Sequence, residues 1–84
     1  MNDKTSIYQI VAALIAELSS IDLEQISPDS ILDEELFLTD TDLVKVLQRI
    51  HQQWNEINLT LHDLSEVSTV QELVDLVVDE LELG

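Results

Sequence analysis

Hydrophobic residues recur at steps of three and four along three stretches of the chain, and this spacing places them on one face of an α-helix. The stretches run from about residue 6 to 19, from about 40 to 54 and from about 70 to 81. Alanines in the first stretch raise its helix propensity further. The sequence therefore predicts three substantial helices, and no segment requires a strand.

The middle helix has a broad apolar face and a well-marked beginning. Either Thr39 or Asp40 stands where a side-chain oxygen could accept hydrogen bonds from the unpaired amides of the first turn. Asp40 and Asp42 also oppose the positive end of the helix dipole. We expect a capped, exposed start, followed by an apolar face made of Leu43, Val44, Val46, Leu47, Ile50 and Trp54.

A long polar stretch separates the first two helices. Residues 27–29, Ser-Pro-Asp, are a turn signal, and one short helical turn is expected at residues 22–25. The aliphatic side chains of this stretch are expected to fold back onto the helices. They are Ile21, Leu23, Ile26, Ile31 and Leu32.

The connection to the last helix is shorter. A short helical turn is expected over residues 62–65. Ser68 or Thr69 is expected to cap the last helix, and Ser68 with Gln71 matches the spacing of a capping box.

Length and charge limit the classes of function. We expect 84 residues to form one domain, 1–84, with an ordered core of about residues 5–82. Eighteen acids against three basic residues give a net charge of −15. This charge repels nucleic acid and anionic membranes and favours a basic protein patch as partner, although it could also serve solubility alone. No membrane span, signal peptide or cysteine is evident, so we expect a cytoplasmic protein.

Three segments together resemble the acyl carrier proteins, the family of phosphopantetheine-bearing carrier domains. Residues 21–30 are similar to the family's loop after its first helix. Residues 34–36, Glu-Glu-Leu, are similar to the acidic-acidic-Leu before its modification site, and residues 67–70 to the entry of its last helix. The resemblance implies an all-α fold: a small bundle of three to four helices with a long loop between helices one and two.

The modification motif of the family is changed in this chain. Typical carriers continue from the acidic-acidic-Leu with Gly, a small residue and Asp-Ser-Leu, and the Ser hydroxyl takes the phosphopantetheine arm. When residues 34–54 are aligned with the family without gaps, Phe37 stands at the Gly, Thr39 at the Asp, Asp40 at the Ser and Thr41 at the Leu.

The resemblance implies that Asp40 replaces the attachment serine. A carboxylate would form only a labile acyl phosphate. Thr41 and Thr39 are possible substitutes, but a step of one residue turns a helical side chain by about 100°. We therefore expect no bound cofactor, and phosphopantetheine only if a threonine substitutes. Phe37 and Leu38 could cover the groove for an acyl chain, or belong to the core.

The recognition helix of the family normally displays acids to partner enzymes. Here Asp42, Lys45 and Arg49 are the candidate partner-binding residues, and Lys45 and Arg49 could instead form ordinary surface ion pairs. A partner that reads an acidic helix should bind this chain poorly.

We hypothesise a carrier-like protein without phosphopantetheine that serves carrier-recognising enzymes of fatty acid, polyketide or related biosynthesis. Synthases, ligases or transferases are the expected partners, with no nucleic acid or membrane and a monomeric state. Two alternatives stay open: a functional carrier modified at Thr41 or Thr39, and an interaction or regulatory domain unrelated to acyl chemistry. No enzymatic activity and no metal site are expected, because His51 and His62 lack the spacing of zinc ligands.

Overall fold

The computed structural model describes residues 4–83 as a helical bundle. It consists of α1 (Lys4–Ser19), a short 3₁₀ turn η1 (Leu23–Gln25), α2 (Asp40–Gln53), α3 (Leu61–Ser65) and α4 (Val70–Leu83). The three long helices and both short turns are confirmed. Residues 1–3 and 84 of the expected domain lie outside the described part.

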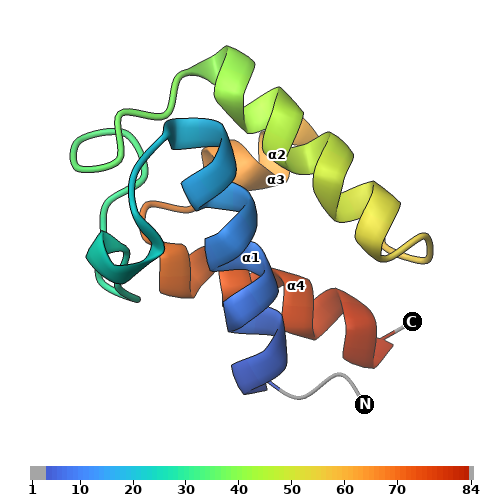
Figure 1. Cartoon of the computed structure of the whole chain (residues 1–84). Helices are drawn as coiled ribbons and strands as arrows, with labels where there is room; N and C mark the ends of the chain where they lie inside the picture. The colour runs from blue at the N-terminus through green and yellow to red at the C-terminus, as the bar shows by residue number, and fades with distance from the viewer. Residues whose placement is uncertain (1–3, 84) are drawn as a thin grey trace.

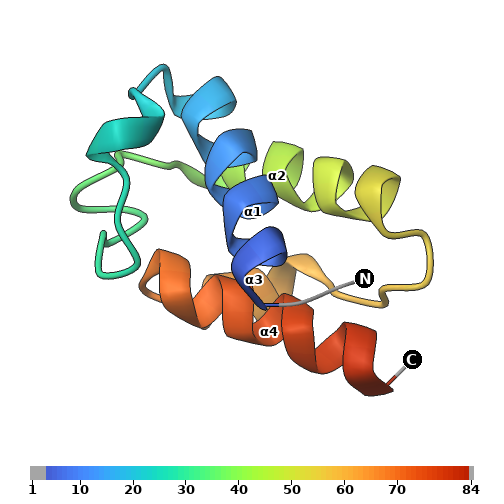
Figure 2. The same cartoon turned by 60° about the horizontal axis from the view of Figure 1, so that its bottom comes forward.

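Helix α1 lies between α2 and α4 and packs against both (Figures 1 and 2). The short helix α3 packs against α2. The long loop of residues 20–39, which we call the first loop, runs along one side of the bundle before it enters α2 (Figure 1). This loop carries the chain to the start of α2, where the candidate site lies.

All the elements contribute aliphatic side chains to one core, except the short turn η1. Because the chain has one Phe, one Trp and one Tyr, this core is almost entirely aliphatic. The largest side chains that are fully buried are Ile7, Val11 and Ile15 of α1, Val46 and Ile50 of α2, Leu64 of α3, and Val70, Leu73, Val74 and Val77 of α4.

The apolar face predicted for α2 is correct except at one position. Val46, Ile50 and Trp54 are buried, and Leu43 and Leu47 are partly buried. Val44 is 37% exposed, so its assignment to the buried face is wrong. The reason is geometric, because the core-facing stripe of a single amphipathic helix is narrower than the six positions that we assigned to it.

The first loop folds back onto the helices as expected, with one exception. Ile26 and Leu32 are buried, and Ile21 and Ile31 are partly buried. Leu23 is 52% exposed because it lies in η1, which buries none of its residues.

Backbone hydrogen bonds fasten the first loop to the start of α4. The amides of Val70 and Gln71, which have no partner inside the helix, donate to the carbonyls of Ser30 (3.1 Å) and Pro28 (2.9 Å). The amide of Leu32 donates in the other direction, to the carbonyl of Ser68 (2.8 Å). Carbonyls of the first loop thus accept hydrogen bonds from the free amides of α4, and these bonds fix the course of the loop.

Thr69, rather than Ser68, caps α4. Its hydroxyl accepts from the amide of Glu72 (3.1 Å), and the Glu72 carboxylate accepts from the amide of Ser68 (3.0 Å). The predicted pairing of Ser68 with Gln71 is therefore wrong by one residue, and Gln71 instead donates to Asp75.

None of the helices in residues 4–83 has the length and hydropathy needed to cross a membrane.

We predict that truncating α2 at its buried face destabilises the protein far more than truncating it at its exposed face. Ile50→Ala leaves a cavity where the side chain is fully buried, and such substitutions cost about 2–5 kcal/mol. Val44→Ala on the same helix should cost less than about 1 kcal/mol. Urea unfolding followed by circular dichroism measures both, and similar costs would contradict the packing of α2.

Candidate functional site at the start of helix α2

Thr39 is the N-cap of α2 and uses its hydroxyl to hold the first turn. The Thr39 Oγ1 accepts from the amide of Asp42 (3.3 Å) and lies 3.2 Å from Asp42 Oδ2, to which it donates. Asp42 Oδ2 also accepts from the amide of Thr39 (3.0 Å), which completes a capping box. Of the two expected caps, Thr39 and Asp40, the structure uses Thr39.

The capping box changes the acidity of Asp42. The hydrogen bond from the Thr39 amide is the largest cause that holds the pKa of the Asp42 carboxyl below its ordinary value. Desolvation, the second largest cause, opposes this lowering of the pKa, and the Thr39 hydroxyl and the positive charge of Lys45 add smaller contributions that lower it. The main role of the Asp42 carboxylate is therefore to hold the first turn of α2.

Asp40 and Thr41 follow the cap with their side chains free. Both are exposed in the first turn of α2. Within the described part of the chain, no hydrogen bond or ion pair joins either side chain to another residue. A carboxylate at residue 40 and a hydroxyl at residue 41 are thus the groups that this corner, residues 37–42, presents to solvent.

Phe37 and Leu38 enter the corner with opposite orientations. Leu38 is buried, so the core interpretation is correct for it. The same interpretation is wrong for Phe37, which is 74% exposed. Both neighbours, Leu36 and Leu38, are buried, and the side chain between them is left facing solvent.

The backbone of Phe37 has a φ of 57°, in the left-handed region. Glycine adopts this region without cost, whereas a residue with a Cβ atom is disfavoured there by about 1–2 kcal/mol. The turn at residue 37 therefore has a backbone conformation typical of glycine, although a bulky aromatic residue occupies it.

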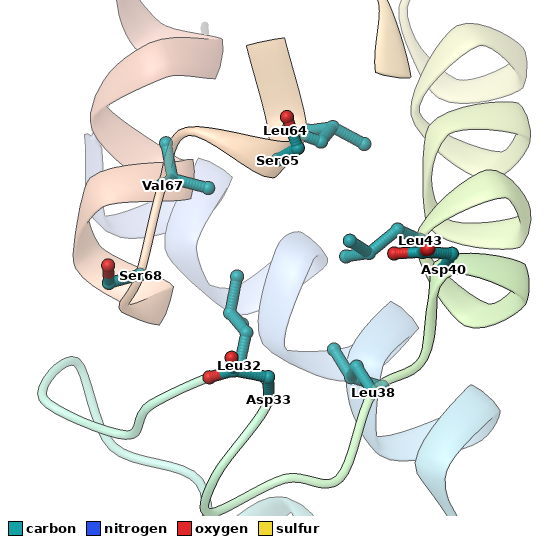
Figure 3. A pocket seen from close by; sticks show the side chains of 9 residues that line it. All are labelled: Leu32, Asp33, Leu38, Asp40, Leu43, Leu64, Ser65, Val67 and Ser68. Atoms are coloured by element: carbon teal, nitrogen blue, oxygen red, sulfur yellow. The ribbon is translucent and has the colours of Figure 1, made fainter. Parts of the chain in front are cut away.

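A cavity of about 200 Å³ opens beside Asp40 (Figure 3). Leu38 and Leu43 line it from the side of α2, while Leu64 lies opposite them at the end of α3. Both polar and apolar side chains complete the lining. The full set is Leu32, Asp33, Leu38, Asp40, Leu43, Leu64, Ser65, Val67 and Ser68. Two carboxylates and two serines of this lining, Asp33, Asp40, Ser65 and Ser68, make the cavity partly polar.

The basic residues of α2 differ in what they contact. Arg49 forms an ion pair with Glu17 of α1 (Nη2–Oε1, 3.0 Å), as the surface-pair interpretation expects. Lys45 is exposed, and no ion pair of its side chain occurs among the described residues. Of the three candidate partner-binding residues, Asp42 forms hydrogen bonds and Arg49 an ion pair among the described residues, whereas Lys45 acts on Asp42 through its charge alone.

The histidines have local roles. His51 lies 3.0 Å from the carbonyl oxygen of Leu59 and ties the end of α2 to the following loop. His62 pairs with Glu66 one turn later (2.9 Å). Residues 4–83 bring together no group of His, Asp and Glu side chains that could hold a metal ion.

The family model for the phosphopantetheine attachment site matches residues 9–77. The chain belongs to this family. The match spans most of the chain, including the first loop, the corner and the start of α4, and it agrees with the helical fold described above. No curated protein shows a significant sequence match.

Domains of this carrier family are non-catalytic and normally carry a phosphopantetheine arm on a hydroxyl group. The resemblance of residues 34–36 places the expected attachment position at residue 40 of the corner. Residue 40 offers a carboxylate, and the Thr39 hydroxyl already accepts one hydrogen bond and donates another. Thr41 is the remaining free hydroxyl of the corner.

The sequence contains a signal that distinguishes Thr39 from Asp40 as the cap of α2, but it contains no signal for the cavity. Thr39 and Asp42 are three residues apart, which is the spacing of a capping box, and the same Thr-x-x-Asp pattern recurs at Thr60 and Asp63. The cavity depends on side chains from three separate stretches of the chain, residues 32–33, 38–43 and 64–68, so no local pattern indicates it.

We predict that acid releases the cap of α2. Because the pKa of folded Asp42 is lowered, its ionised form stabilises the fold above the unfolded pKa, near 4. That contribution disappears as the pH falls through the lower, folded value. The amide resonance of Thr39, followed by NMR from about pH 6 to about pH 2, should titrate with Asp42.

The control variants for this titration are Asp42→Asn and Asp63→Asn. Asp42→Asn should abolish the pH dependence at Thr39. Asp63→Asn, in the matching box of α3, should leave it unchanged. A Thr39 resonance that stays constant to low pH would show that Asp42 does not accept its hydrogen bond.

We predict that Phe37→Gly stabilises the protein by about 0.5–1 kcal/mol, because glycine relieves the left-handed backbone. Phe37→Ala keeps the Cβ atom and should give no such gain. Ser20→Gly should give a similar gain to Phe37→Gly, because Ser20 has a φ of 62°. Urea unfolding measures all three, and a loss of stability in Phe37→Gly would mean that the ring itself holds the fold together.

Proposed function

We propose that this chain is a carrier-family protein that is not loaded with phosphopantetheine and acts as a binding or accessory module. Its partners are cytoplasmic enzymes that recognise carrier folds, such as synthases, ligases or transferases of fatty acid, polyketide or related biosynthesis. It has no catalytic activity of its own in this proposal. The observation that carries the proposal is the exposed carboxylate of Asp40 at the start of α2.

The chemistry of arm transfer supports this proposal. Transfer requires a hydroxyl oxygen that attacks the pyrophosphate of coenzyme A and forms a phosphodiester. Asp40 has no hydroxyl group, and the mixed anhydride that a carboxylate would form is labile in water. The hydroxyl of Thr39 is engaged with Asp42, and its removal from the cap would leave amides of α2 unsatisfied.

The binding role is supported by a frame that retains the carrier fold. The helices, the first loop and the start of α2 are all present within the family match. Enzymes that read the shape of a carrier domain therefore have a surface to recognise. Family membership favours such partners over an interaction domain unrelated to acyl chemistry.

We expect Lys45 of α2 to select partners that differ from those of carriers with an acidic α2. From Leu43 to Gln53 the helix has no carboxylate and carries both Lys45 and Arg49. Arg49 is paired with Glu17, whereas Lys45 forms no ion pair among the described residues and offers its charge to solvent. An enzyme whose basic patch contacts residues 43–53 of α2 would meet Lys45 there and bind poorly.

A second candidate function rests on Thr41. Its hydroxyl is exposed, makes no hydrogen bond within the described residues and lies one position after Asp40. A transferase that accepts this displaced hydroxyl would make the chain a working carrier.

We predict that the wild-type protein gains no mass when incubated with coenzyme A and a broad-range phosphopantetheinyl transferase. Asp40→Ser should gain the mass of one arm, because it restores a hydroxyl on an intact frame. Asp40→Asn, the matched control, removes the charge without adding a hydroxyl and should gain nothing. Intact-mass spectrometry measures each variant.

Two outcomes would contradict this proposal. A quantitative gain by the wild type would show that the chain is a carrier, and Thr41→Val or Thr39→Val would then identify the modified residue by abolishing the gain. Failure of Asp40→Ser to gain the arm would show that the frame is no longer recognised by such enzymes.

A further inference from the structure

Phe37 is the most exposed large hydrophobic residue in the described part of the chain. Its exposure is 74%, compared with 52% for Leu23, 38% for Leu61 and 37% for Val44. A single exposed hydrophobic residue is ordinary on a protein surface. The exposure of Phe37 is therefore not enough to indicate a binding residue without a second property.

The second property is that no local requirement explains a phenylalanine at this position. The ring is largely outside the core, so it gains little from burial. The left-handed backbone would be better served by glycine. Phe37 is thus unfavourable for the isolated protein in both respects, which is typical of a residue that serves binding rather than folding.

The backbone around Phe37 is held firmly. The amide of Leu36 donates to the carbonyl of Ile31 (3.0 Å), and the amide of Leu38 donates to the carbonyl of Leu32 (2.9 Å). Both flanking side chains are buried, and the capping box of α2 follows directly. The ring therefore projects from a backbone that is already ordered, which lowers the entropic cost of binding through it.

The charges around Phe37 indicate the chemistry of its partner. Four exposed acids, which we call the acidic rim, lie within four residues of it in the sequence: Asp33, Glu34, Glu35 and Asp40. Among the described residues none of these four carboxylates forms an ion pair, and only that of Glu35 forms a hydrogen bond, which it accepts from the amide of Ile31 (3.0 Å). The chain has no Lys or Arg from residue 5 to residue 44. A complementary surface is apolar at its centre and basic at its edge.

Other occupants of this surface fit less well. A second copy of the chain would bring another net charge of −15 to the same rim. A nucleic acid could stack its bases on the ring, but its phosphates would be repelled by the acids.

We propose that Phe37 is the anchor residue of a docking surface, and that it inserts into an apolar pocket of a partner protein whose rim carries Lys and Arg side chains. The acidic rim pairs with those basic residues around the ring. This inference rests on the proposed function, because it names the surface through which the binding module would engage its enzyme.

The test begins by finding the partner and then measures binding with pure proteins. The photoreactive amino acid p-benzoylphenylalanine, placed at residue 37 of the full chain in its own cell, should crosslink one protein on irradiation. The same amino acid at Leu23, the next most exposed large hydrophobic position, should not crosslink that protein. The crosslinked protein is then purified and titrated with the unmodified chain by calorimetry.

Four variants separate the role of the ring from its effect on stability. Phe37→Ala and Phe37→Gly should each weaken binding by about 30-fold or more, as expected for an anchor residue. Phe37→Tyr should stay within about fivefold of the wild type, because it keeps an aromatic ring. Ser20→Gly changes the backbone in the same way away from the surface, and should bind within about twofold of the wild type. Binding should also weaken as salt screens the rim.

The inference is overturned if Phe37→Ala binds within about twofold of the wild type, or if residue 37 crosslinks no protein that residue 23 does not. A crosslink to a second copy of the chain, or to an acidic surface, also overturns it. The proposed function is overturned by a different result, which is the acceptance of the phosphopantetheine arm by the wild type. A partner bound through Phe37 that has no relation to carrier enzymes would reject the proposed function and keep this inference.

Discussion

Helices α2, α3 and α4 each begin with backbone amides that have no partner inside the helix, and a threonine followed by an acid meets this need in all three. Thr39 works with Asp42, Thr60 with Asp63 and Thr69 with Glu72. A small core supplies little free energy to spare, so these ends cannot be left unsatisfied. At α4 the first loop adds two carbonyl acceptors, which joins the beginning of the last helix to the chain before α2.

This constraint decides what the corner can offer to other molecules. Because the Thr39 hydroxyl is part of the cap, it is not free for other chemistry without cost to α2. Asp40 takes no part in the cap and faces solvent. The same corner holds Phe37 in a conformation that suits glycine. The chain therefore has the fold of a carrier domain, and its corner presents a carboxylate and an aromatic ring to solvent.

The helices of this fold were predictable because each carries a long apolar pattern that tertiary packing reinforces. The site was predictable only in part. The pattern located the start of α2 and narrowed its cap to Thr39 or Asp40, and the resemblance gave the family. The exposure of Val44, Leu23 and Phe37 was not predictable, since it depends on which neighbours reach each position. The cavity beside Asp40 depends on segments that are distant in the sequence.

The capping box of α2 has one more consequence, which concerns how this protein could change over evolutionary time. Its hydrogen bonds involve residues 39 and 42 and bypass residue 40. The cap and the exposed side chain at position 40 are thus encoded by different residues. Over many generations the side chain at position 40 can be exchanged by a single substitution while the capping box and the helix that it begins are inherited unchanged.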